Sequence, residues 1–330
     1  MLLLQKRINK GRGSNKAKLT LADYVNTFGQ DIKARYGHRV HKIAIDATFT
    51  CPNRDGSKGR GGCSFCNNAS FSPNGLKPET ISSQIDAGKR VIRKRTGALH
   101  YIAYFQAYTN TYGDIDKLRS TYDQALEQQN IVGLSVGTRP DCVPQPVLEL
   151  LADYQQQGYE VWLELGLQSS FDVTLERVNR GHDYKSYCDA VDAAHNYNLN
   201  VCTHLMLGLP GEDKSHALTT LQRVIAKGVA GLKIHPLHVV KGTRLANEWR
   251  RNEYIPLEFN DYIETVCDMI ELTPADVVYH RLTGTAPDKI LLAPLWCGKK
   301  WQVLNAIKTE LERRSTSQGI FSERIGACPN

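Results

Sequence analysis

The stretch KIAIDATFTCPNRDGSKGRGGCSFC, residues 42–66, joins a predicted strand to a loop that contains three cysteines. Its first five residues, KIAID, form a short apolar run between charged residues, which predicts a buried strand. The loop that follows contains one proline and four glycines between Cys51 and Cys66, so its backbone can fold tightly. The sequence therefore places Cys51, Cys63 and Cys66 in one compact loop after the carboxyl end of a strand.

Beyond this loop, short runs rich in β-branched and aromatic residues alternate with longer segments of helical period. This alternation is expected of βα units around a parallel sheet. Together with the first run, the predicted strands are residues 42–46, 101–105, 131–136, 160–165, 201–207 and 231–235. The predicted helices between them are residues 78–95, 114–128, 145–156, 170–179, 184–197 and 214–227.

Repeated βα units close into a barrel or spread into a doubly wound open sheet, and both folds place their sites at the carboxyl ends of the strands. Six units fall short of the eight in a complete barrel. We therefore predict an α/β fold, a partial TIM-like (βα)6 barrel that is open on one side, with an open sheet as the alternative. After residue 243 the alternation fades into helices at 243–254, 259–272 and 300–314 and one strand at 277–282, which predicts an α+β extension.

Three regions follow from this pattern in the 330-residue chain: a basic, mobile arm (1–25), the barrel (26–242) and a carboxyl-terminal extension packed on the barrel (243–330). The 41 Lys and Arg residues exceed the 34 Asp and Glu residues by seven, which fits a nucleic-acid partner without requiring one. No apolar stretch approaches the roughly 20 residues of a membrane span. We expect a cytoplasmic protein with no membrane partner.

Thiolate ligands favour either zinc or an iron–sulfur cluster. A structural zinc needs a fourth ligand, which His38 or His41 is near enough in sequence to supply. A cubane cluster held by three cysteines instead leaves one iron open to a chelating substrate. The cysteines alone fit both interpretations, but their place at the end of the first strand favours an active site.

The sequence resembles the radical S-adenosylmethionine (SAM) superfamily, and within it the YhcC-type proteins, which are related to the elongator catalytic subunit and to coproporphyrinogen III oxidase-like enzymes. The resemblance covers about residues 26–301. It rests on CPNRDGSKGRGGCSFC, AYFQAYTNTY, VGTRPDCVP, VWLELGLQS, NRGHD, GLPGE and KIHPLHVVKGT. The superfamily's common cysteine spacing is C-x3-C-x2-C; the longer gap between Cys51 and Cys63 is typical of this subgroup.

The resemblance implies that Cys51, Cys63 and Cys66 bind a [4Fe-4S] cluster whose open iron is chelated by SAM. It also implies reductive cleavage of SAM to a 5′-deoxyadenosyl radical that abstracts hydrogen from a substrate. An external low-potential electron donor, similar to flavodoxin or ferredoxin, would supply the electron. The sequence does not identify the substrate, and RNA is one candidate.

The resemblance also implies a set of SAM contacts, although it assigns no catalytic residue. Phe65 would lie against the adenine, and Arg180 would pair with the carboxylate of SAM. The superfamily's glycine-rich motif falls on positions that are not glycine in this sequence: Gln106, Ala107 and Tyr108. The remaining predicted contacts follow or lie within the third, fourth and fifth predicted strands: Thr138, Glu164, Gln168 and His204.

A zinc-stabilised RNA-binding module without radical chemistry is the alternative function. In that interpretation the basic arm would hold RNA through its phosphates. Metal content after anaerobic reconstitution distinguishes the two.

Overall fold

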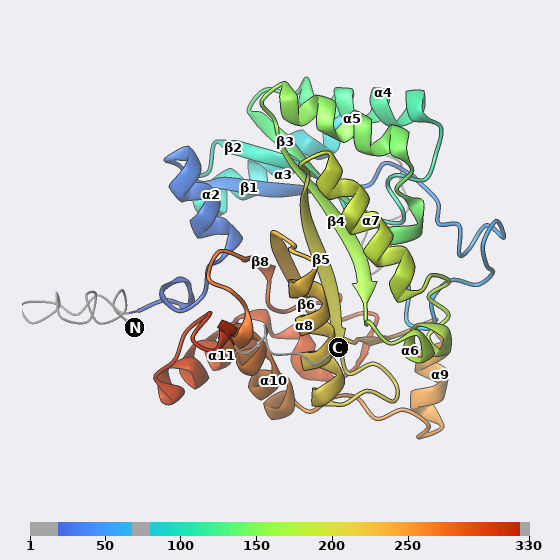
Figure 1. Ribbon diagram of the computed structural model, residues 1–330, viewed down its shortest axis with the longest axis vertical. Helices are drawn as coiled ribbons and strands as arrows, with labels where there is room; N and C mark the ends of the chain where they lie inside the picture. The colour runs from blue at the N-terminus through green and yellow to red at the C-terminus, as the bar shows by residue number, and fades with distance from the viewer. Residues whose placement is uncertain (1–18, 68–79, 324–330) are drawn as a thin grey trace, which may run out of the picture.

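The computed structural model of the protein describes residues 19–67 and 80–323. Figure 1 shows a curled sheet with helices packed around its outer face. Seven parallel strands make up this sheet, in the order in which they are named here: β1 (Val40–Ile45), β2 (His100–Phe105), β3 (Ile131–Thr138), β4 (Glu160–Gln168), β5 (Asn200–Leu207), β6 (Gly231–Pro236) and β8 (Val278–Arg281).

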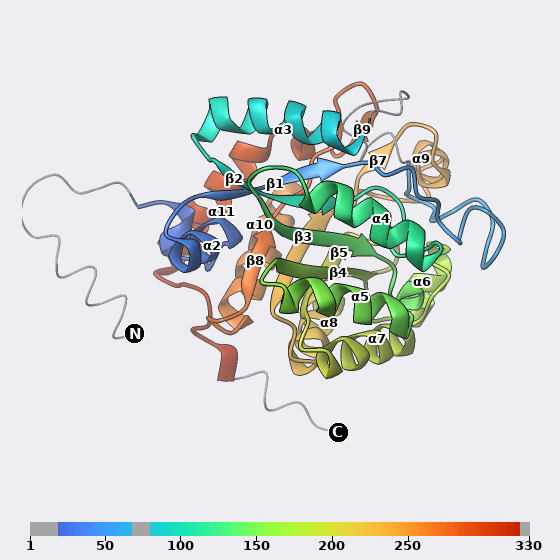
Figure 2. The same ribbon diagram turned by 90° about the horizontal axis from the view of Figure 1, so that it is seen from above.

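Figure 2 shows how the helices surround the convex side of the sheet. Most of them connect successive strands: α3 (Ile81–Thr96), α4 (Ile115–Leu126), α5 (Gln145–Gln156), α6 (Asp172–Arg177), α7 (Tyr184–Asn196) and α8 (Lys214–Ala226). Aspartates begin three of these helices, because Asp114, Asp183 and Asp213 accept hydrogen bonds from backbone amides of the first turn. None of the helices in the described residues is long and apolar enough to span a membrane.

The described residues before β1 and after β6 add further elements. Before β1 lie the short helix η1 (Leu21–Asp23) and α2 (Phe28–Tyr36). After β6 lie α9 (Arg244–Arg250), α10 (Phe259–Leu272), α11 (Lys300–Arg314) and a small antiparallel pair, β7 (Val239–Val240) with β9 (Leu291–Ala293). The short helices η3 (Pro140–Cys142) and η4 (Leu295–Gly298) follow β3 and β9.

The predicted α/β partial barrel is confirmed, with one strand more than the six predicted. The strand expected at 277–282 in the extension is β8, which pairs parallel with β6 and continues the barrel sheet. Its connection to β6 runs through α9 and α10 rather than through one helix, so the sequence alternation fades there. The segment after residue 242 thus contributes one strand to the barrel sheet. Residues 1–18 of the predicted arm lie outside the described residues.

Side chains on the concave face of the sheet form layers, as in complete barrels. The layer nearest the amino ends is apolar and combines Phe28 and Ile32 of α2 with side chains from the strands: Val40, Ile102, Trp162, Cys202 and Val278. The next layer, called the polar layer below, takes one residue from each strand of the sheet: Lys42, Tyr104, Ser135, Glu164, His204, Lys233 and His280. Above it, at the carboxyl ends, the barrel is hollow.

Candidate active site

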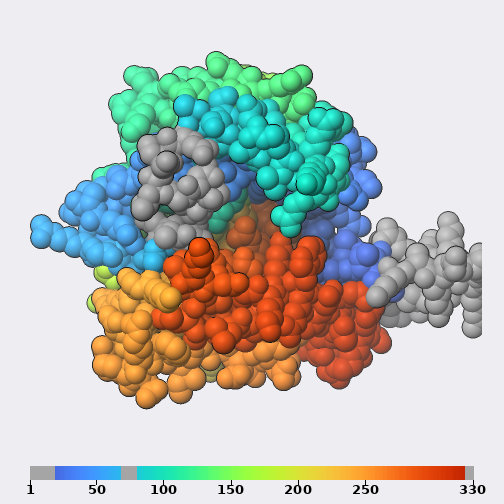
Figure 3. All heavy atoms as spheres, turned by 180° about the vertical axis from the view of Figure 1, so that it is seen from behind, coloured from blue at the N-terminus to red at the C-terminus, as the bar shows by residue number. Residues whose placement is uncertain are grey.

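A cavity of about 370 Å³ occupies the carboxyl ends of the strands. It is bordered by all three predicted cluster ligands, Cys51, Cys63 and Cys66. Seen from behind, the molecule is hollowed between the blue-green α3 segment and the orange-red carboxyl-terminal segment (Figure 3). Thr285 and Lys300 of the latter segment line the cavity, so the extension contributes to its wall.

The cysteines border the cavity without converging on one point. No group of three His, Cys, Asp or Glu side chains in residues 19–67 and 80–323 is arranged to hold a single metal ion. A cubane is broader than an ion, so thiolates that hold one stand further apart than the ligands of zinc. Burial, followed by the neighbouring Cys63, raises the pKa of the Cys66 thiol to about 11. A cationic group bound among these thiols would reverse that effect.

The histidines that would complete a zinc site lie at the wrong end of the barrel. His38 precedes β1 and its ring lies 4.0 Å from that of His100, the first residue of β2. His41 is the second residue of β1, whereas Cys51 follows the carboxyl end of that strand. The fourth ligand considered for zinc is therefore not available from His38 or His41.

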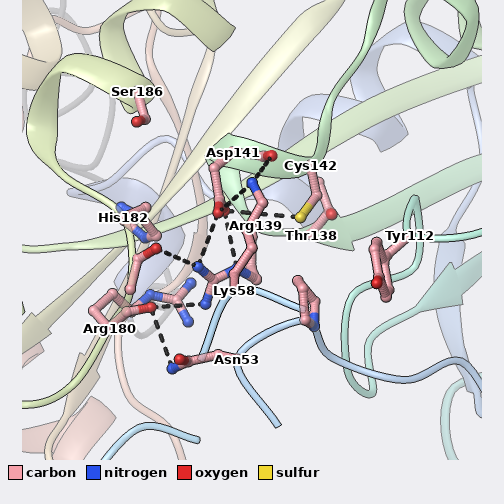
Figure 4. Close-up of polar contacts among 12 residues, drawn as sticks. Asn53, Lys58, Tyr112, Thr138, Arg139, Asp141, Cys142, Arg180, His182 and Ser186 are labelled. Carbon is pink, nitrogen blue, oxygen red and sulfur yellow. Dashed lines mark hydrogen bonds and ion pairs between the residues drawn. The ribbon is translucent and has the colours of Figure 1, made fainter. Parts of the chain in front are cut away.

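Residues 179–181, which follow α6, make hydrogen bonds to the cysteine loop and to Arg139. Figure 4 shows Arg180 with Asn53, Arg139 and Asp141 around it. Nδ2 of Asn53 donates to the carbonyl of Asn179 at 2.6 Å, and Nδ2 of Asn179 donates to the carbonyl of Gly62 at 2.8 Å. Arg139 donates to the carbonyls of Arg180 and Gly181 at 2.7 and 3.0 Å. Asp141 fixes the Arg139 guanidinium from the other side at 2.9 Å.

The sulfur of Cys63 receives two hydrogen-bond donors. Nη1 of Arg180 lies 3.5 Å from it and Nδ2 of Asn53 lies 3.8 Å from it. Nε of Arg180 and Oδ1 of Asn53 are buried and have no partner within the described part of the chain. A sulfur that binds iron carries negative charge, and hydrogen-bond donors directed at it suit that charge. This donor set fits a thiolate-bound cluster.

Of the predicted SAM contacts, seven border the cavity: Phe65, Gln106, Tyr108, Thr138, Gln168, Arg180 and His204. Ala107 and Glu164 do not border it. Ala107 is buried beneath its neighbours and is 3% exposed. Arg180 contacts Cys63 and donates to the carbonyl of Gly166 at 2.6 Å, so two of its nitrogens are already engaged by the protein.

Glu164, predicted to contact SAM, lies inside the polar layer. Its hydrogen-bond partners there are side chains of the protein. One oxygen accepts from Lys42 at 2.6 Å and from Ser135, and the other contacts His204 at 2.8 Å and Lys233. Burial disfavours the charged carboxylate, but Lys233 and Lys42 outweigh it and hold the pKa of Glu164 well below its usual range. Glu164 therefore supports the floor of the cavity.

Two cavity residues have strained backbones. Gln168 has φ 79° and Tyr108 has φ 66°, in the left-handed region that side chains other than glycine rarely adopt. Gln168 also follows a register irregularity between β4 and β5. Strain of this kind gathers at ligand sites, where the surrounding structure compensates for it.

The lysines of the polar layer were not among the residues predicted from the sequence. Each lysine stands in an otherwise largely apolar strand, Lys42 in β1 and Lys233 in β6, and this was the available signal. Tyr104, whose hydroxyl accepts from Nζ of Lys233 at 2.9 Å, borders the cavity from the same layer.

Comparisons with known proteins agree with this architecture. A model of the radical SAM superfamily matches residues 48–224, and a model of the radical SAM C-terminal domain matches residues 229–313. The protein YhcC of Escherichia coli K12 is 47% identical over 308 residues, which cover 93% of this chain and 97% of YhcC. A tRNA uridine(34) acetyltransferase of Dehalococcoides mccartyi is 28% identical over 61% of this chain and 42% of its own length.

Among solved structures, Elp3 of the archaeon Methanocaldococcus infernus superposes with a TM-score of 0.64. The match covers 88% of this chain and 68% of that chain at 18% identity, so it supports the fold alone. The family models and the similarity to YhcC reach further, because they span the cysteine loop and the whole barrel. The chain belongs to the radical SAM superfamily and is a SAM-dependent iron–sulfur enzyme.

Proposed function

We propose that Cys51, Cys63 and Cys66 hold a [4Fe-4S] cluster and that SAM binds beside it in the cavity. The observation that carries this proposal is the meeting of three thiols with Arg180 and a hollow barrel end at one place. When bound, the cluster supplies the electron that breaks a carbon–sulfur bond of SAM, which yields methionine and a 5′-deoxyadenosyl radical.

The side chains around the cavity would bind the cluster, orient SAM and shield the radical from water. Arg180 and Asn53 direct N–H groups at the sulfur of Cys63 and so offer hydrogen bonds to a cluster ligand. Gln106 and Gln168 offer amide groups to the polar parts of SAM, and Phe65 offers an aromatic face to its adenine. The apolar side chains of Met206 and Leu237 also line the cavity and exclude water from the radical.

Members of this superfamily take their electron from an external reductant, and we propose a flavodoxin- or ferredoxin-like donor here. For the hydrogen donor, we propose RNA as the first class of substrate to test. The excess of 41 basic over 34 acidic residues supports phosphate contacts, and one similar protein is a tRNA-modifying enzyme by name. Most of the basic amino-terminal segment lies outside the described residues.

Anaerobic reconstitution tests the cluster and the cleavage together. The proposal requires about four iron and four sulfide per chain and formation of 5′-deoxyadenosine from SAM under dithionite. Cys63→Ala should lose both, whereas Cys188→Ser, on helix α7 outside the cavity, should retain both. Stoichiometric zinc without cleavage would instead support the RNA-binding module.

The substrate class is tested with cell extract in the same assay. Hydrogen uptake or loss is followed in extract components while 5′-deoxyadenosine forms, with and without prior ribonuclease treatment. An RNA substrate requires that the treatment abolish the coupled reaction; undiminished coupling would exclude RNA and leave a small molecule or a protein.

A further inference from the structure

A β-bulge turns Arg281 into the barrel. Along the β6–β8 pairing, Leu232 faces Tyr279 but Lys233 faces Arg281, so His280 is an extra residue on β8. His280 already points inward, since its Nδ1 lies 2.9 Å from Nζ of Lys42. The extra residue makes Arg281 point inward as well, and it lines the cavity. Bulges that redirect a side chain are common beside active sites.

Arg281 lines the cavity together with residues that are close to it in the chain or that its charge affects, and this set is here called the β8 end. They come from β8, from the segments that follow β6 and β8, and from the start of α11: His238, Arg281, Thr283, Gly284, Thr285 and Lys300. The cysteines reach the same cavity from the loop after β1. The β8 end and the proposed cluster site therefore come from different segments of the chain.

In the described part of the chain, the two cations of the β8 end, Arg281 and Lys300, form no ion pair with an acidic side chain. Glu164, the carboxylate of the adjoining polar layer, is already shared between Lys42 and Lys233. A cation that lines a cavity and has no counterion leaves that part of the cavity electropositive.

The charge of Arg281 contributes to lowered pKa values in the neighbouring basic groups. Burial and then Arg281 hold the pKa of His235 well below its usual range, and burial and then Arg281 lower the pKa of Lys300. Burial also lowers the pKa of His238 to about 4, with Arg281 acting in the same direction. An anion placed among these groups would relieve the repulsion between them.

Neutral hydrogen-bonding groups complete the β8 end. Nε2 of His238 is buried and has no partner in the described part of the chain. Thr283 is 2% exposed and borders the cavity. Gly284 passes so close to His235 that a Cβ atom would lie 2.5 Å from its Nδ1, so this glycine lets the loop lie against the histidines.

We propose that the β8 end binds an anionic group of the substrate, a phosphate or a carboxylate, through Arg281 and Lys300. This deepens the proposed function, on which it rests for the identity of the cavity, by naming a chemical class for the molecule that meets the radical. The guanidinium offers paired N–H donors to such a group, and the lysine adds a point charge. The anion orients the substrate within the cavity, while the cysteine loop holds the cofactors.

Inorganic phosphate is the probe, with acetate as the carboxylate arm and sodium chloride as the ionic-strength control. Binding is measured anaerobically on the reconstituted enzyme by thermal shift and calorimetry. We expect phosphate or acetate to stabilise the wild-type enzyme beyond the chloride control. Arg281→Gln and Lys300→Gln should each weaken that affinity about tenfold. Lys299→Gln changes an exposed neighbour outside the cavity and should leave the affinity unchanged.

Three outcomes would overturn the proposal: no stabilisation beyond chloride, equal anion affinity in wild type and Lys300→Gln, or an anion that competes with SAM. Competition would assign the β8 end to the carboxylate of SAM itself. If Arg281→Gln fails to fold, Lys300→Gln carries the test because Lys300 lies at the rim. The anion affinity is measurable whether or not SAM is cleaved, so this proposal and the proposed function can fail separately.

Discussion

Nζ of Lys42 lies 2.6 Å from Oε1 of Glu164, which ties the first strand of the sheet to its fourth across the inside of the barrel. On the other side of the same carboxylate lies Lys233, from β6. One buried carboxylate thus balances two lysines directly beneath the cavity. Since each partner comes from a different strand, this arrangement holds the curvature of the sheet.

Glu164→Gln should destabilise the protein by about 3–5 kcal/mol, because it removes the buried carboxylate that Lys42 and Lys233 share and leaves both amino groups without that partner. The double variant Glu164→Gln/Lys233→Met should recover part of that loss, since one of the two amino groups that lost its partner is removed as well. Urea unfolding of the apo-protein measures both. Glu127→Gln, at an exposed position after α4, should change stability by less than about 0.5 kcal/mol. If Glu164→Gln were as stable as the wild type, the contacts of Glu164 with Lys42 and Lys233 would contribute nothing to stability.

The pH dependence of stability should reveal Lys233. Burial lowers its pKa from 10.5 to about 7, against the opposing effect of Glu164. Between these values the unfolded chain binds more protons than the native protein, so the free energy of unfolding rises with pH in that window. The slope from this group is at most about 1.4 kcal/mol per pH unit.

Lys233→Met removes the group, so the wild type should gain stability relative to this variant as pH increases from 7 to 9.5. Denaturant unfolding at several pH values measures the difference in unfolding free energy between the two proteins. The contributions of titratable groups common to both cancel in that difference. A difference that stays constant or shrinks with increasing pH would contradict the lowered pKa.

Two glycines should respond in opposite directions to alanine. A Cβ atom on Gly133 of β3 would lie 2.0 Å from the backbone oxygen of Glu160, and the paired strands leave no room to move. Gly133→Ala should therefore cost about 1–3 kcal/mol. A Cβ atom on Gly29 of α2 meets nothing within 4 Å, so Gly29→Ala should stabilise the helix by about 0.5–1 kcal/mol. Thermal unfolding compares both variants with the wild type, and the same sign for both would contradict this packing.

Features encoded by contiguous residues were predictable from the sequence. The cysteine loop, the alternation of strands and helices, and the bounds of α10 and α11 all depend on local pattern, and the structure reproduces them. The strand at 277–282 was predicted, but its place beside β6 was not, because β8 is four residues long and its pairing depends on the closure of the sheet.

The partners of individual side chains were not predictable in this way. The strand pattern shows that Glu164 is internal. It does not show that Glu164 pairs with Lys42, which is 122 residues away in the sequence. The bulge that turns Arg281 inward depends on pairing between two strands and leaves no signal in either one. Arg180 was expected at the carboxylate of SAM, and its contact with Cys63 crosses 117 residues.

The contact between Arg180 and Cys63 gives the last prediction, which rests on the proposed cluster. A cation and N–H donor beside a ligand sulfur favours the more negative, reduced state and raises the reduction potential. Arg180→Gln should therefore shift the potential of the reconstituted cluster to more negative values, while the iron content stays close to that of wild type. Arg177→Gln, an exposed arginine at the end of α6, is the matched control and should leave the potential unchanged.

A spectroscopic redox titration of the cluster measures this shift without any turnover of SAM. If the potential of Arg180→Gln equals that of Arg177→Gln, the 3.5 Å contact has no electronic effect, and Arg180 serves only to brace the loop through its bond to the carbonyl of Gly166. A loss of iron in Arg180→Gln would also mean that Arg180 serves to brace the loop. Only a shifted potential on an intact cluster supports Arg180 as the residue that tunes the electron transfer to SAM.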